Sequence, residues 1–199
     1  MTERWSLSDM QVYGAEDQEE MDAIMRAMDR FEQDNRHDTR PAGMDAITVS
    51  FLSDDDRPAV VEMLASSSDF SHSLLDQYRR RGAYPTLIAT RGSQIEGVLS
   101  GSFDANLHGN REFEEFTMPP RPHGFLARIF VHEGARDNEV GRTLIRAYAA
   151  EALSRRCTFI GGVLDRGGEL AARRRFFKNS GFAITANDVF GAPVDLLLP

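Results

Sequence analysis

Hydrophobic and polar positions follow one another along the chain in a pattern that predicts a mixed α/β domain from Ala46 onward. Short apolar or alternating runs, typical of strands, are separated by apolar residues at helical spacing. The predicted strands cover residues 46–52, 84–90, 94–103, 125–131, 158–164, 182–190 and 194–198. The predicted helices cover residues 59–66, 70–80, 140–154 and 169–179. A hairpin is expected at Arg91-Gly92-Ser93, and Gly181 suits the end of the last helix.

The first 43 residues have a different pattern. Apolar side chains at helical spacing between Met21 and Phe31 predict an amphipathic helix. A polar stretch that ends in Pro41 and Gly43 follows and is typical of a linker. We therefore expect an acidic helical arm and linker over residues 1–43 and a domain over residues 44–199. The apolar face of the arm suits packing or homodimer formation, and an arm that binds another partner is the alternative.

The charge of the protein is divided unevenly between these two parts. The 199 residues carry 31 acidic and 23 basic side chains, a net charge of -8, of which residues 1–42 account for -6. The nearly balanced remainder argues against a general nucleic-acid binder. The single cysteine, Cys157, excludes an internal disulfide. No apolar run approaches the roughly 18–20 residues that span a bilayer, and the N-terminus shows no signal segment. We therefore expect a cytoplasmic protein with neither a membrane nor a nucleic-acid partner.

The junction between residues 125–131 and residues 140–154 is where the sequence suggests chemistry. A strand leads into a polar turn that opens directly into a helix, so unpaired backbone N–H groups and the positive end of the helix dipole point outward. Such a junction binds anions, most naturally phosphate. Gly141 would allow close approach of a ligand, and Arg136 and Arg142 would add charge. Many ordinary strand-turn-helix junctions have the same pattern, which is the alternative interpretation.

Three segments resemble the GNAT superfamily of N-acetyltransferases. The run from Arg136 to Gly141 (RDNEVG) is similar to the Arg/Gln-x-x-Gly-x-Gly/Ala turn that binds the pyrophosphate of acyl-CoA in that family. The run from Phe176 to Phe182 (FFKNSGF) is similar to the family's aromatic-rich helix that ends in Gly-Phe, and residues 87–101 resemble its central hairpin. The resemblance covers residues 46–199. It implies an α/β (α+β) acyl-CoA N-acyltransferase fold: a mixed, mostly antiparallel central sheet flanked by helices, here with an added N-terminal helical arm.

The resemblance also implies an activity: transfer of an acetyl group from acetyl-CoA to a primary amine by direct attack in a ternary complex. The acceptor would be a small molecule or a peptide. Strand 125–131 would separate from strand 158–164, so that pantetheine pairs with backbone groups of Phe130 and Val131. Phe176 and Phe177 would wall the thiol end of the cleft. The expected cofactor-binding residues are Phe130, Val131, Arg136, Asp137, Asn138, Glu139, Val140, Gly141, Arg142, Thr143, Phe176 and Phe177.

The sequence departs from the family pattern at several positions. Glu139 stands where the turn has its first glycine, and Glu133 replaces the usual proline. Phe177 occupies the position that often holds a tyrosine, which is thought to protonate the leaving thiolate. These departures motivate an alternative function: a degenerate, non-catalytic member that binds acyl-CoA or a partner.

Several carboxylates and histidines are candidates for the proton acceptor. Glu133 and Asp165 come first as catalytic residues, since they follow the two strands that should separate; Glu96 and His132 are further candidates. His108 lies in a long loop with three glutamates, which would line a site for a cationic amine or else form a solvated acidic loop. These glutamates are Glu112, Glu114 and Glu115. His, Asp and Glu residues show no convincing metal-ligand spacing, so no metal is expected.

Overall fold

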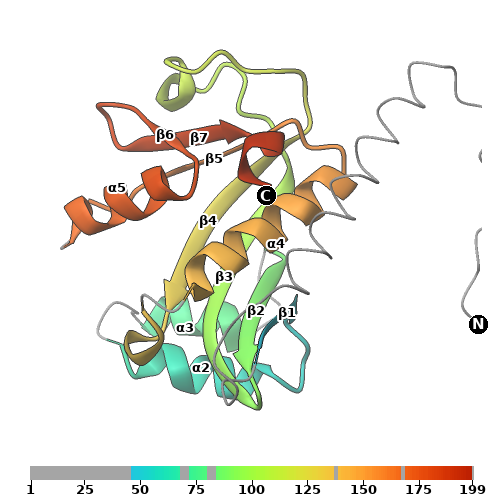
Figure 1. The fold of residues 1–199 in the computed structure, drawn as a ribbon, viewed down its shortest axis with the longest axis vertical. Helices are drawn as coiled ribbons and strands as arrows, with labels where there is room; N and C mark the ends of the chain where they lie inside the picture. Colours follow the sequence, from blue (N-terminus) through green and yellow to red (C-terminus); the bar gives the residue numbers. More distant parts are fainter. Residues whose placement is uncertain (1–45, 68–71, 80–83, 137–138, 167–168, 199) are drawn as a thin grey trace, which may run out of the picture. The chain divides into compact units, whose positions relative to one another are not determined.

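The computed structural model describes residues 46–67, 72–79, 84–136, 139–166 and 169–198. Within them, seven strands form one sheet in the order β1-β2-β3-β4-β5-β7-β6, flanked by helices α2 to α5 (Figure 1). The strands are β1 Ile47–Phe51, β2 Thr86–Arg91, β3 Gln94–Ala105, β4 His123–Val131, β5 Phe159–Val163, β6 Ala183–Ile184 and β7 Val189–Pro193. The helices are α2 Arg57–Ala65, α3 His72–Arg79, α4 Val140–Ser154 and α5 Leu170–Asn179.

The sheet is antiparallel except at one pair of strands. β1 to β4 form a continuous antiparallel ladder, and β5, β7 and β6 form a second one. The two ladders meet where β4 and β5 run parallel. The predicted hairpin is confirmed: Arg91 pairs with Gln94, and Gly92 at the turn has a φ of 57°, which glycine adopts without a steric cost. The predicted mixed, mostly antiparallel sheet flanked by helices is therefore confirmed.

Two apolar clusters cover opposite faces of the sheet. α2 and α3 pack on one face through Val60, Leu64 and Leu75, together with Val98 and Phe130 of the sheet. On the other face lie α4 and α5. The apolar cluster on this face includes buried side chains of both helices and of β7: Leu144, Ile145, Tyr148, Phe177 and Phe190. Figure 1 shows α4 lying across β3 and β4. The pattern of α4 agrees with its burial, because its apolar residues recur at helical spacing and its exposed positions are polar.

The predicted closing strands were wrong in their positions. Residues 182–190 were expected to form one strand, but they contain the short β6, a turn at Asp188 with a φ of 64°, and the start of β7. Residues 194–198 were expected to form the last strand, but Val194–Leu197 is a 3-10 helix that packs against α4. Burial of Val194 and Leu197, which are three residues apart, explains the turn: alternation in an extended strand would place them on opposite faces. The predicted arm, its linker and its homodimer interface lie outside the described residues.

Candidate active site

A wedge opens between β4 and β5. The two strands pair over three residue pairs only: His123 with Phe159, Gly124 with Ile160, and Phe125 with Gly161. From there β5 continues beside β7, with Gly162 opposite Phe190, while β4 continues beside β3. The edge of β4 from Leu126 to Val131 therefore has no strand partner on the β5 side. The separation of these two strands, expected from the sequence, is present.

The register of β4 against β3 decides which backbone groups face the wedge. The His132 amide N donates to the carbonyl O of Glu96 at 2.8 Å, so this residue pair is a hydrogen-bonded one. Hydrogen-bonded and non-hydrogen-bonded pairs alternate along an antiparallel ladder. Phe130 therefore bonds to β3, whereas the N–H and C=O groups of Ile129 and Val131 point into the wedge. Sequence reasoning named Val131 but missed Ile129, because hydrogen-bond register cannot be read from residue types.

The narrow end of the wedge, its apex, is built from a bulge and two glycines. The register of β3 and β4 shifts between Ser100 and Gly101, which leaves Ala127 as an extra residue in β4. A side chain at Gly162 would collide with the carbonyl O of Leu126 and the ring of Phe190, and one at Gly161 would collide with Phe113. Glycine is thus required at both positions by close packing. One residue further along, Val163 is 39% exposed, so an apolar side chain faces solvent beside the opening.

The turn after β4 is closed by its own hydrogen bonds. The Nδ1 atom of His132 accepts from the Gly134 amide N at 3.2 Å and starts a 3-10 helix over Glu133–Ala135. His132 is therefore engaged in the turn. The guanidinium of Arg136 is exposed and lies 3.8 Å from the carboxylate of Glu169. Asp137 and Asn138, two of the expected cofactor-binding residues, lie outside the described residues.

Glu139 adopts a backbone conformation that favours glycine. Its φ is 63°, and it immediately precedes α4. Its carboxylate turns back to the Arg142 guanidinium, at 2.9 Å, while its carbonyl accepts from the Thr143 hydroxyl and amide. The side chain of Glu139, the residue before α4, makes no capping hydrogen bond to the first turn, whose backbone N–H groups have no partner within the helix. The glycine-like geometry of the motif is thus kept although the glycine is absent, with Val140 buried beneath it.

Phe176 and Phe177 have different surroundings. A Cβ at Gly141 would come within 2.9 Å of the Phe176 ring, so this ring packs directly on the start of α4. Phe177 is buried and stacks on Phe190, with ring centroids 4.1 Å apart, and contacts Phe182 edge-on. The space beside Gly141, expected to admit a ligand, is therefore shared with Phe176.

The candidate proton acceptors lie on or just after the strands around the wedge: Glu133 follows β4, Asp165 follows β5, and Glu96 belongs to β3. Glu133 and Asp165 are both exposed, and the Asp165 carbonyl accepts from Arg173. Asp165 is four residues from Gly161 at the apex, at most about 14 Å of extended chain, whereas Glu133 is eight residues from Phe125. Glu96 is half-buried and paired with Arg91 at 2.9 Å; its second oxygen is buried and has no hydrogen-bond partner among the described residues.

A long loop covers the part of the sheet that lacks a helix. It joins β3 to β4, and its Leu107, Phe113 and Phe116 form a third apolar cluster with Phe159. Fully buried His123 ties the loop to the sheet: its Nδ1 accepts from the Leu107 amide, and its Nε2 donates to the Pro119 carbonyl at 2.9 Å. His108 also reaches Pro119. The loop lines an open pocket of about 290 Å³.

Two buried titratable groups near the apex have structural roles. The Tyr148 hydroxyl donates to the carbonyls of Ser102 and Phe125, at 2.8 and 3.1 Å, and burial raises its pKa far above the ordinary range. Burial likewise raises the pKa of Cys157, whose thiol donates to the Phe103 carbonyl, to about 11. Both groups hold protons at neutral pH, so neither acts as a base. Among the described residues, no three His, Cys, Asp or Glu side chains form a group that would hold a metal, and no helix is long and apolar enough to cross a membrane.

Comparison with known proteins places this geometry in a family. Residues 50–182 match the model of the acetyltransferase (GNAT) family. The fold resembles PaiA N-acetyltransferase from Thermoplasma acidophilum in complex with coenzyme A (TM-score 0.52, 14% identity, 74% of this chain and 99% of that one). It also resembles the ribosomal-protein-S18-alanine N-acetyltransferase from Escherichia coli (0.55, 16%, 75% and 94%). A third similar structure is an aminoglycoside N-acetyltransferase in complex with CoA (0.58, 17%, 73% and 93%). At the level of sequence, no curated protein matches the chain.

Proposed function

The chain belongs to the GNAT family of acetyltransferases, and from that membership we propose that it transfers an acetyl group from acetyl-CoA to a primary amine. The observation that carries the proposal is the wedge between β4 and β5, whose open edge presents the backbone of Ile129 and Val131 and leads toward the start of α4. The pantetheine arm of acetyl-CoA contains amides, so it can pair with the open strand edge. The pyrophosphate of acetyl-CoA suits the start of α4, because helix N-termini bind phosphate.

The residues around the wedge would divide the work of binding. The amides at the start of α4, with Gly141 and Thr143, would hold the pyrophosphate, and Arg136 and Arg142 would add positive charge. Val131 and Ile129 would pair with the pantetheine, and Phe130 would fix their register through β3. Near the apex, a backbone N–H of β4 would polarise the acyl oxygen.

The chemistry needs little from side chains. When bound, acetyl-CoA supplies an activated acetyl group: the amine nitrogen bonds to the carbonyl carbon, and the carbon–sulfur bond breaks with its electron pair on sulfur. The nitrogen loses one proton and the sulfur gains one, so that the products are an amide and CoA. A base must accept the proton from the nitrogen. We propose Asp165 as the first residue to test and Glu133 as the second, because Asp165 is nearer to the apex along the chain. Phe177 offers no proton, so water or another donor would protonate the thiolate.

A thermal-shift titration with acetyl-CoA tests the proposal. A ligand that binds the folded state must raise the melting temperature. No shift at saturating acetyl-CoA would refute the acetyltransferase proposal. A clear shift without CoA release across a panel of amines would instead favour the alternative, a non-catalytic binder. For the base, Asp165→Asn should lower kcat and leave the Kd of acetyl-CoA nearly unchanged; unchanged turnover in both Asp165→Asn and Glu133→Gln would remove these carboxylates from the mechanism. A cytoplasmic location and a homodimer remain predictions.

A further inference from the structure

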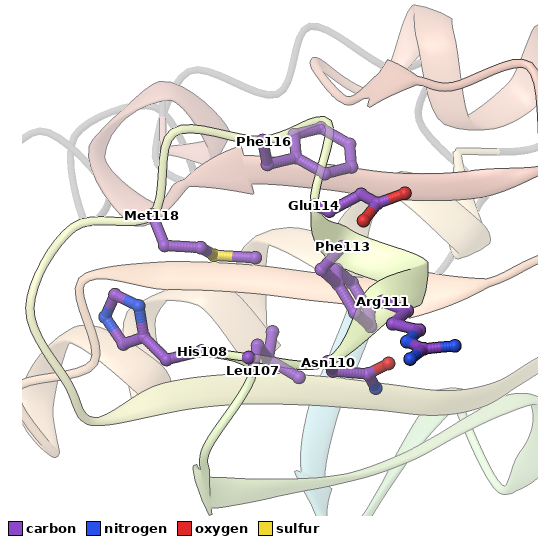
Figure 2. A pocket seen from close by; sticks show the side chains of 9 residues that line it. Leu107, His108, Asn110, Arg111, Phe113, Glu114, Phe116 and Met118 are labelled. Carbon is purple, nitrogen blue, oxygen red and sulfur yellow. The ribbon is translucent and has the colours of Figure 1, made fainter.

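The loop between β3 and β4 lines an open pocket of about 290 Å³. Figure 2 shows it between the two arms of the loop: His108 and Asn110 line it from one arm, Met118 from the other, and Glu114 from the turn between them. The remaining lining residues are Leu107, Gly109, Arg111, Phe113 and Phe116. The wall thus combines apolar and polar side chains in about equal share, so it offers contacts both to an apolar group and to a polar or charged one.

The pocket lies next to the apex of the wedge. Its Phe113 ring stands over Gly161, so closely that a Cβ there would lie 2.5 Å from the ring. Gly161 pairs with Phe125 in the last residue pair before the strands separate. One ring therefore forms both a wall of the pocket and the cover of the apex. This face of the sheet is opposite the one that α4 covers, as the separate apolar clusters of Phe113 and Tyr148 show.

An exposed apolar side chain connects the pocket with the wedge. Side chains two residues apart in a strand point to the same face, so Val163 points to the side of the sheet on which Phe113 covers Gly161. Val163 is 39% exposed there. A ligand held in the pocket would thus reach the wedge over an apolar surface, from the face opposite α4.

The charge at the pocket suits a cation. Glu114 lines it, and Glu112 and Glu115 are exposed in the same loop, against one lining arginine, Arg111. A primary amine is protonated at neutral pH until it is deprotonated for attack. A carboxylate at the rim would attract this cation, while aromatic and methionine side chains would bury its apolar group.

We propose, on the premise of the acetyltransferase function, that this pocket binds the apolar group of the acceptor, a small primary amine with an alkyl or aryl chain. After it loses a proton to solvent, the amine nitrogen attacks the thioester carbon. A C–N bond forms, the C–S bond breaks with its electron pair on sulfur, and one nitrogen proton is transferred to the sulfur, giving an N-alkylacetamide and CoA.

The first test measures binding without turnover. The full-length protein is titrated with 2-phenylethylamine and with its neutral analogue 2-phenylethanol, followed by thermal shift. We expect the amine to raise the melting temperature and the alcohol to do so at higher concentration. Glu114→Gln should raise the apparent Kd of the amine about two- to fivefold, the range for an exposed ion pair, and leave that of the alcohol unchanged. Glu112→Gln is the matched control, since Glu112 is exposed in the same loop but does not line the pocket.

The second test measures specificity with linear alkylamines. If the pocket buries the chain, kcat/KM should rise up to about fourfold per added methylene and then level off when the pocket is full. Met118→Ala enlarges the pocket and should move the optimum to longer amines, a gain that misfolding cannot produce.

The outcomes separate this inference from the acetyltransferase proposal. If acetyl-CoA stabilises the protein but kcat/KM is independent of chain length and Glu114→Gln matches Glu112→Gln, the pocket assignment is wrong and the acetyltransferase proposal stands. If acetyl-CoA gives no shift, the acetyltransferase proposal fails. The amine titration then decides the pocket by itself: equal binding of amine and alcohol, or no binding of either, overturns it.

Discussion

Glu139 gives the sharpest test of the proposal that the turn before α4 binds phosphate. The residue has a φ of 63° and bonds to Arg142 at 2.9 Å, with both side chains almost half exposed. We predict that Glu139→Gly tightens CoA binding, because it removes a negative charge from the phosphate site and releases the guanidinium of Arg142. Glu139→Gln is the matched control that removes the charge but keeps a side chain at the left-handed position.

The magnitudes follow from exposure and geometry. Two unit charges about 4 Å apart in water interact by about 1 kcal/mol, which sets the upper limit for an exposed site. The Kd of CoA should therefore fall about two- to fivefold in both variants. For stability, glycine relieves about 1–2 kcal/mol of left-handed strain but costs about 0.5–1 kcal/mol in chain entropy. The lost exposed ion pair costs about 0.2–0.5 kcal/mol. The stability of Glu139→Gly should thus lie between about 0.5 kcal/mol below and about 1.3 kcal/mol above that of the wild type.

The assay is calorimetric titration with CoA at low salt and at about 1 M salt, where the Debye length is roughly 3 Å. The gain in affinity should be present at low salt and absent at high salt. An unchanged Kd in both variants at low salt would refute the role of the charge. A gain in Glu139→Gly alone would assign the effect to the backbone instead.

Three further outcomes are expected. Gly141→Ala should displace the Phe176 ring, which lies 2.9 Å from the new Cβ, and weaken CoA binding. Gly134→Ala is the control, because the atom nearest to its new Cβ is 3.4 Å away. Equal Kd values of CoA for the two variants would contradict the packing argument. Tyr148→Phe should lower the free energy of unfolding by about 1–3 kcal/mol, measured by urea denaturation, because two buried carbonyls lose their donor. Cys157, with a pKa raised from 9.0 to about 11, should resist iodoacetamide at pH 7.5. Because the thiol ionises at a lower pH in the unfolded chain, the contribution of Cys157 to stability should be complete below about pH 9 and lost as the pH rises to about 11. In alkaline urea titrations, Cys157→Ala should lack this part of the pH dependence. Rapid alkylation of the folded protein would contradict the buried geometry.

The sequence determined the order of the elements, because hydrophobic periodicity is a local property. Helix α4 begins and ends where the pattern predicted, and the strands before it are within a few residues. The C-terminal segment was the exception. Val194 and Leu197 read as a strand from their apolar character, yet contacts with α4 bury both in a 3-10 turn. Tertiary packing overrode local propensity there.

The turn that we propose as the phosphate site was marked in the sequence, but its geometry was not. The run from Arg136 to Gly141 marks the motif in the sequence, whereas the left-handed backbone of Glu139 and the direction of its carboxylate appear only in the structure. Residue types do not specify which rotamer a carboxylate adopts. Likewise, Gly141 was predicted to allow close approach of a ligand. The structure shows that the ring of Phe176, 35 positions away in the sequence, packs against this glycine.

Only the tertiary structure decided which groups line the wedge and what lies next to it. Strand separation requires three strands, β4, β5 and β7, to meet in a register that non-local pairing fixes, so Ile129 could not be selected in advance. The loop pocket depends on Phe113 closing over Gly161, a contact between residues that no motif relates. The sequence by itself thus indicated the family and the element order, and it marked the turn that we propose as the phosphate site. The acceptor side depended on long-range packing, because its residues become neighbours only when the sheet and its loop are assembled.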